Sequence, residues 1–185
     1  MWAFRARFKL ALESLQTAHG LKLPESPIEL QNLCWMEDKM ASIYGYLGDH
    51  KMGLEWIERS LETWRRWSES TGAALACPPL LKLTHGRILA HGGWLDEARF
   101  QLTEAIDGLL SAKPLVWAPT ASCKFALGRL LMFEKKYDAA ARMMLLESQS
   151  MWLQGDKSRA LDVNGIVVYQ LGCCALLRGD VDSAV

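Results

Sequence analysis

The sequence predicts an all-α fold, built as a stack of helix-turn-helix repeats. Three observations predict it: a turn recurs every 42 to 45 residues, a small residue precedes each turn by seven positions, and the residues between turns follow helical apolar spacing. Half of the 185 residues are hydrophobic and 23% are charged, which is typical of a folded chain rather than a disordered one.

The first two expected helices span residues 3–18 and 27–47. The first is amphipathic, with an apolar face made by Phe4, Phe8, Leu12 and Leu15. The second begins with the sequence "SPIE", which is typical of a capping box in which Ser26 and Glu29 cap each other's backbone and Pro27 occupies the first turn.

The next three expected helices span residues 50–69, 78–91 and 95–110. Asp49 is the candidate N-cap of the first. Pro78 and Pro79 suit the first turn of the second, and the stretch "LDEARFQL" opens the third.

The last expected helices span residues 116–133, 137–153 and 157–178, and another begins at 181. Pro119 marks the first turn at 116, and Asp180 is the candidate N-cap at 181. Trp152 follows Ser148 at the distance at which Trp64 follows Ser60, which predicts that the second helix of each pair is long.

The repeat is defined by its turns and small residues. The turn positions, where glycine would take the left-handed conformation that ends a helix, are Gly48, Gly93, Lys135 and Gly179. The small residues, which would let two helices approach, are Ala41, Gly86, Gly128 and Gly172 before the turns, and Gly53, Ala98, Ala140 or Ala141, and Ala184 after them.

One repeat domain is therefore expected over residues 1–185. Its parts would be the second helix of a preceding repeat at 1–20, repeats at 26–70, 77–111 and 115–154, and an incomplete repeat at 156–185. A single hairpin cannot bury its apolar face alone, so the hairpins should stack. The half-repeats at both ends predict that the sequence belongs to a longer protein.

These residues resemble the tetratricopeptide repeat, whose pattern is W-x2-L-G-x2-Y…A-x3-F. The matching stretches are "LGRLL" at 127–131, "LGCCA" at 171–175, "YDAAA" at 137–141 and "LDEARFQL" at 95–102, and the resemblance covers roughly residues 26–185. The repeats are about ten residues longer than the usual 34, as in kinesin light chains and the sensor arms of bacterial STAND-type ATPases and maltose-type activators. The resemblance implies a right-handed superhelical α-solenoid that binds proteins.

Composition and motifs exclude several function classes. Lys plus Arg and Asp plus Glu both number 21, so no basic face for nucleic acid is indicated. No apolar run is long enough to span a membrane. Arg5, Arg7 and Lys9 interrupt the continuous apolar segment that a signal peptide would need near the N-terminus. No nucleophile, phosphate-binding or metal-binding motif occurs, so no enzyme activity, cofactor or metal is expected.

The cysteines predict a cytoplasmic location. They are odd in number and lie within apolar helical patterns without C-x-x-C spacing, which favours reduced, buried thiols in an intracellular protein; they are Cys34, Cys77, Cys123, Cys173 and Cys174.

The resemblance also implies a partner-binding groove, lined by the first helix of each repeat. The residue after each small residue would point into it, which gives Ser42, Arg87, Arg129 and Cys173. Residues one helical turn away, and two tryptophans that extend the surface, complete the candidate groove: Trp35, Asp38, Tyr46, Leu83, His91, Trp117, Phe125, Phe133, Tyr169 and Leu177. Aromatic residues and arginine dominate binding hot spots. In the alternative interpretation, the arginines pair with acids on the next helix and the aromatics form the core.

Three functions stay open. The first is a module that binds a protein or peptide, as the adaptor or sensor part of a larger regulatory protein. The second is the small-molecule-sensing arm of a STAND-type signalling ATPase or a transcription regulator. The third is a scaffold that forms homo-oligomers through exposed terminal helices.

Overall fold

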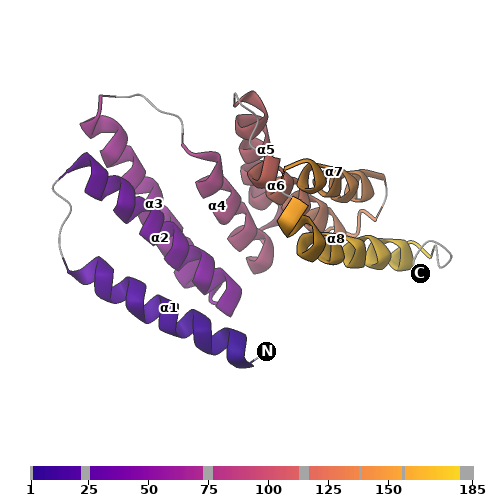
Figure 1. Cartoon of the computed structure of the whole chain (residues 1–185), viewed down its shortest axis with the longest axis horizontal. Coiled ribbons are helices and arrows are strands. Elements are labelled where there is room, and N and C mark those ends of the chain that lie inside the picture. Colours follow the sequence, from indigo (N-terminus) through magenta and orange to yellow (C-terminus); the bar gives the residue numbers. More distant parts are fainter. Residues whose placement is uncertain are drawn as a thin grey trace. The chain divides into compact units, whose positions relative to one another are not determined.

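The structure, a computed structural model, describes residues 2–21, 26–72, 77–112, 117–137, 139–155 and 157–179. This part of the chain contains eight helices and no strand (Figure 1). The helices are α1 (Trp2–Gly20), α2 (Pro27–Leu47), α3 (His50–Ser70), α4 (Pro79–Gly92), α5 (Leu95–Ser111), α6 (Trp117–Phe133), α7 (Ala139–Gly155) and α8 (Lys157–Leu177). The all-α prediction is confirmed, and each predicted helix matches an observed one to within two residues at either end. The helix expected at 181, with its cap Asp180, lies outside the described residues.

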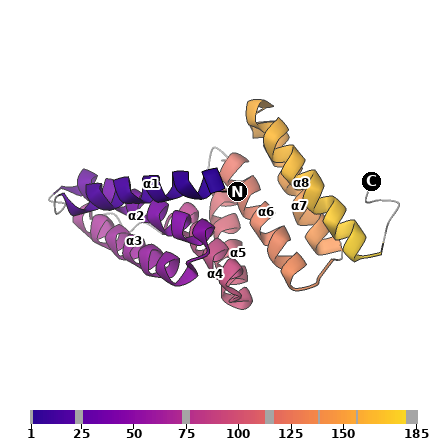
Figure 2. The ribbon, with the colours of Figure 1, turned by 90° about the horizontal axis from the view of Figure 1, so that it is seen from below.

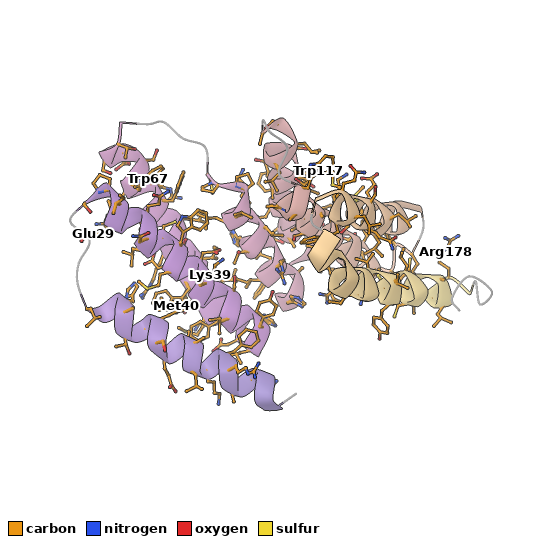
Figure 3. All side chains as sticks on the ribbon, viewed as in Figure 1. Glu29, Lys39, Met40, Trp67, Trp117 and Arg178 are labelled. Carbon is orange, nitrogen blue, oxygen red and sulfur yellow. The ribbon has the colours of Figure 1, made fainter. Side chains whose placement is uncertain are left out.

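The predicted caps of α2 and α3 are confirmed. The side chain of Ser26 accepts a hydrogen bond from the backbone N–H of Glu29 at 3.3 Å, and Glu29 Oε2 accepts one from the N–H of Ser26 at 2.9 Å. Figure 3 shows Glu29 at the beginning of α2. Asp49 Oδ1 accepts from the N–H of Met52 at 3.1 Å, which caps α3. These bonds satisfy donors that helix starts leave unpaired.

The four predicted turn positions share one backbone conformation. The φ angles of Gly48, Gly93 and Gly179 are 88°, 92° and 79°, and Lys135 has a φ of 59° although it carries a side chain. All four are left-handed, as the repeat predicts, and each ends a helix at the same point of the repeat.

The chain forms two compact units, Met1–Trp94 and Leu95–Val185. In the first, α2 lies between α1 and α3, and α4 packs on α2 and α3 (Figures 1 and 2). In the second, α6 packs on α5, α7 and α8, and α7 also packs on α8. The division into repeats within a single domain stays a prediction.

Small residues lie where paired helices approach each other. A Cβ placed on Gly53 of α3 would lie 3.3 Å from the carbonyl oxygen of Ala41 in α2. A Cβ placed on Gly128 of α6 would lie 3.4 Å from the carbonyl oxygen of Ala141 in α7. Both contacts join a residue before the turn to one after it, as predicted. The structure does not describe the side chain of Ala140 or any part of Ala184.

A buried serine links the same two helix pairs. Ser60 Oγ of α3 donates to the carbonyl oxygen of Cys34 in α2 at 2.8 Å, and Ser148 Oγ of α7 donates to that of Ala121 in α6 at 2.9 Å. Cys34 and Ala121 each precede their turn residue, Gly48 or Lys135, by the same number of positions. The two helix pairs are therefore alike in a buried polar contact as well as in their turns.

The core of the first unit is built around residues that are fully or almost fully buried. They include Met40 from the middle of α2, Ile57 from α3 and Leu81 and Ile88 from α4 (Figure 3 labels Met40). From α1, Leu12 is buried, while Phe8 and Leu15 are half-buried against this core. The side chain of Phe4 lies outside the description.

The burial of the cysteines agrees in part with the prediction. All five cysteines are free thiols, and Cys34, Cys123 and Cys174 are buried as predicted, while Cys77 and Cys173 are half-buried. Within the described ranges, no helix is both long and apolar enough to cross a lipid bilayer.

Candidate binding pockets

A small open pocket lies between α2 and α4 of the first unit. It is lined by Ser42, Gly45, Tyr46, Thr84, Arg87, Ile88 and His91. On each helix these residues recur at spacings of three or four, so that they share one face. Four of the predicted groove residues meet here: Ser42, Tyr46, Arg87 and His91.

Arg87 is held by an aromatic residue of α2. Its Nη2 donates to Tyr46 Oη at 2.5 Å, and the guanidinium carbon lies 5.2 Å from the centroid of the tyrosine ring. The same ring also stacks on Phe8 of α1, with centroids 5.4 Å apart and 9° between the ring planes. Arg87 forms no ion pair with any carboxylate of the described residues, and the alternative of pairing with an acid stays untested.

A glycine in the pocket lining lets α2 and α4 approach each other. A Cβ placed on Gly45 would lie 3.1 Å from Cγ1 of Ile88, so α2 and α4 approach closely at this point. At the rim, the ring of His91 stacks on that of His50 from α3, with centroids 6.2 Å apart and 9° between the planes. Nδ1 of His50 is buried and has no hydrogen-bond partner in the described part of the chain.

Two hydroxyl groups in the pocket are not used by the fold. Ser14 and Thr17 on α1 donate to carbonyl oxygens of the preceding turn of their own helix. Ser42 and Thr84, in contrast, make no hydrogen bond through their side chains to the residues that the structure describes. Their hydroxyls remain available to a ligand.

A second pocket lies in the second unit, between the end of α6 and α8. It is lined by Arg129, Met132, Phe133, Lys135, Tyr137, Gln170 and Leu177. The guanidinium carbon of Arg129 lies 5.8 Å from the ring centroid of Phe133. Arg129 follows the small residue Gly128, as Arg87 follows Gly86. Both units therefore present an arginine beside an aromatic ring at the same repeat position.

The other predicted groove residues line neither pocket. Asp38 is 2% exposed, with Oδ2 at 3.0 Å from Nζ of Lys39, and Leu83 is buried in the core. Trp35 packs against the core of the first unit and Phe125 is half-buried, whereas Tyr169 is 68% exposed on α8. Asp38 and Leu83 lie one turn before Ser42 and Arg87, where the packing of the helices has already covered the surface.

A buried polar cluster joins the first three helices away from the pocket. Glu37 of α2 is almost fully buried, and its Oε2 accepts from Thr63 Oγ1 of α3 at 2.7 Å. Its Oε1 lies 3.2 Å from Nε2 of His19, which attaches α1. Sequence reasoning missed this cluster, because partners 18 and 26 residues from Glu37 leave no local pattern.

Other missed residues belong to the pockets themselves. Thr84 could have been found, because it lies three residues before Arg87 on the same helix face. Lys135, Tyr137 and Gln170 could not, because they enter the second pocket only through the packing of α8 and the α6–α7 turn. In the described ranges, no cluster of three or more His, Cys, Asp or Glu residues is arranged to hold a metal ion.

Comparison with known proteins does not identify a family for this chain. No protein-family model, curated protein or solved structure matches this chain.

Proposed function

We propose that this chain is a binding module of the tetratricopeptide type, whose hairpins stack into a right-handed superhelix and which binds a peptide segment of a partner protein. The observation that carries the proposal is the pocket between α2 and α4. Four residues chosen from the repeat register as groove residues line it, and an arginine beside an aromatic ring recurs at the same register in the second unit.

The chemistry of the pockets suits recognition rather than catalysis. Arginine and tyrosine combine a large contact area with directional hydrogen bonds, and they are enriched at the sites that contribute most binding energy. Arg87 is already oriented by Tyr46, so little side-chain freedom would be lost on binding. The module would act by binding alone, as the adaptor or sensor part of a regulatory protein.

Selection from a displayed library of random peptides tests this proposal. We expect peptides that bind the wild-type chain and lose about tenfold or more in affinity for the double variant Arg87→Glu, Arg129→Glu, since each substitution reverses a charge in a pocket. The control is Lys51→Glu, Arg66→Glu, which makes the same charge change at two exposed positions of α3. Circular dichroism checks that all variants remain helical.

Two results would contradict the proposal. One is a selection that enriches no peptide, which would remove the peptide-binding function. The other is equal loss of binding in the pocket variant and in the control, which would mean that only net charge matters.

The surface of α8 favours a second candidate function, a self-assembling scaffold. Apolar side chains that are about half exposed or more gather on this helix: Ile166, Val168, Tyr169, Leu176 and Leu177. A patch of this kind is typical of an interaction surface. Sedimentation velocity over a range of concentrations distinguishes the candidates, because the scaffold predicts oligomers that Ile166→Asp dissociates and the peptide module predicts a monomer.

A further inference from the structure

The pocket between α2 and α4 presents hydrogen-bond donors and a positive charge without a balancing negative one. Its lining includes the guanidinium of Arg87 and no carboxylate. Among the described residues, that guanidinium interacts with the phenol of Tyr46, which is neutral. The pocket is therefore suited to an anion rather than to a cation or a neutral group.

The bond between Arg87 and Tyr46 also orients the phenol. Because Tyr46 Oη accepts a hydrogen bond from Arg87, its own O–H proton must point elsewhere and can be donated to a ligand. The stacked ring of Phe8 also fixes the position of the tyrosine. A guanidinium and a phenol thus act together as donors at one side of the pocket.

The two unused hydroxyls complete the set. Ser42 on α2 and Thr84 on α4 line the same pocket, and neither hydroxyl bonds to the described residues. The lining then contains four side chains with a donor that can serve a ligand: Ser42, Tyr46, Thr84 and Arg87. A phosphoryl group has three acceptor oxygens and nearly two negative charges, while a carboxylate has two oxygens and one charge, so the phosphoryl group matches this set better.

We propose that the pocket binds the phosphoryl group of a phosphoserine or phosphothreonine side chain in the partner peptide. This inference rests on the proposed function and names the chemistry of its ligand. Arginine is the residue best suited to such a group, because its planar fork binds two phosphate oxygens at once.

Three pools of short fluorescein-labelled peptides test the inference by fluorescence anisotropy. The pools are degenerate except at the central residue, which is phosphoserine, serine or glutamate. We expect the phosphoserine pool to bind about tenfold or more tightly than the serine pool, with the glutamate pool between them. Arg87→Gln should abolish this preference, and Tyr46→Phe, which keeps the ring, should weaken it severalfold. Arg66→Gln removes an exposed charge from α3 and should leave the preference unchanged.

Each other outcome overturns the inference in a different way. Equal binding of the phosphoserine and glutamate pools would assign the pocket to carboxylates. Equal binding of all three pools, with displayed peptides still dependent on Arg87, would keep the peptide-binding function and remove the phosphoryl ligand. If no peptide binds in either assay but inorganic phosphate shifts the amide NMR signals of Ser42 and Thr84, the pocket takes a free anion and the peptide-binding function fails.

Discussion

Lys135 adopts a conformation that the three equivalent turns give to glycine. At φ 59° a side chain is strained, because its Cβ approaches the following carbonyl oxygen. We expect Lys135→Gly to raise the free energy of unfolding by up to about 1 kcal/mol. The substitution relieves the backbone strain, but part of this gain is lost because glycine gives the unfolded chain more conformational entropy. Chemical denaturation measures this change.

The reverse substitution at Gly93 is the matched control. Its φ is 92° and a Cβ there would meet no atom within 4 Å, so Gly93→Ala tests the backbone alone and should lower the free energy of unfolding by about 1–2 kcal/mol. A loss of stability in Lys135→Gly would instead mean that the lysine side chain, which lines the second pocket, makes a favourable contact.

The thiol of Cys34 predicts a dependence of stability on alkaline pH. Burial is the main cause that raises its pKa from 9.0 to about 11, against the opposing hydrogen bond with Ser60. The unfolded chain loses this proton at lower pH than the folded chain. The raised pKa of Cys34 therefore adds to the free energy of unfolding in full below about pH 9, and this contribution is lost as the pH rises towards 11.

Substitution of Cys34 isolates that effect from the other groups that titrate in the same range. Cys34→Ser should show a smaller fall in the denaturation midpoint than the wild type between about pH 8 and pH 10.5, because a serine hydroxyl does not ionise there. Identical falls in the two proteins would assign the alkaline loss to other side chains.

At the scale of helix pairs, the close packing of α6 on α7 depends on a glycine, Gly128. A Cβ on Gly128 would lie 3.0 Å from Cγ and 3.1 Å from Cδ2 of Leu145, and 3.4 Å from the Ala141 carbonyl oxygen. Gly128→Ala should lower the free energy of unfolding by about 1–3 kcal/mol, because α6 and α7 must separate or Leu145 must leave its rotamer. Thermal unfolding measures the change.

Gly165 on α8 provides the control for that substitution. A Cβ there would meet nothing within 4 Å, so Gly165→Ala should raise stability by about 0.5–1 kcal/mol through helix propensity alone. A similar gain in Gly128→Ala would show that the helix pair adjusts without cost.

The ends of the helices were predictable because their signals are local. Ser26 and Glu29 cap α2 through contacts between residues three positions apart, and Gly48 ends it within one turn. Such contacts form in the same way whatever surrounds the helix. The start of α7 was the less accurate case: Tyr137 was predicted to open this helix, but α7 begins at Ala139.

At the scale of the whole molecule, the two compact units predict how stability is distributed. Ile57 in the first unit and Leu145 in the second are both fully buried. Replacing either by alanine should cost about 2–5 kcal/mol, from lost burial and the cavity left behind. Native-state hydrogen exchange should then accelerate strongly in the unit that carries the substitution and much less in the other.

The same pair of variants also tests whether the repeats form one cooperative array. Equal acceleration in both units from Ile57→Ala and from Leu145→Ala would mean that the chain unfolds as a single domain, as the repeat register predicts. Acceleration confined to one unit would mean that the boundary near residue 94 separates independent folding units.

The sequence by itself determined the helices, the turns and the small residues that join helix pairs. Gly48, Gly93, Lys135 and Gly179 recur at a regular interval, and all four take the left-handed conformation because the chain must reverse after each helix. The pattern also located four residues of the first pocket, because their positions follow from the helical period.

Only the tertiary structure decided which parts of those helix faces stay open and what each side chain meets. Asp38 lies one turn from Ser42, yet Asp38 is buried and Ser42 lines the pocket. A helix has 3.6 residues per turn, so side chains four positions apart point in slightly different directions, and the neighbouring helices cover only one of the two. The bond between Tyr46 and Arg87 joins residues 41 positions apart. It exists because α4 packs on α2, and no local pattern in the sequence encodes the contact.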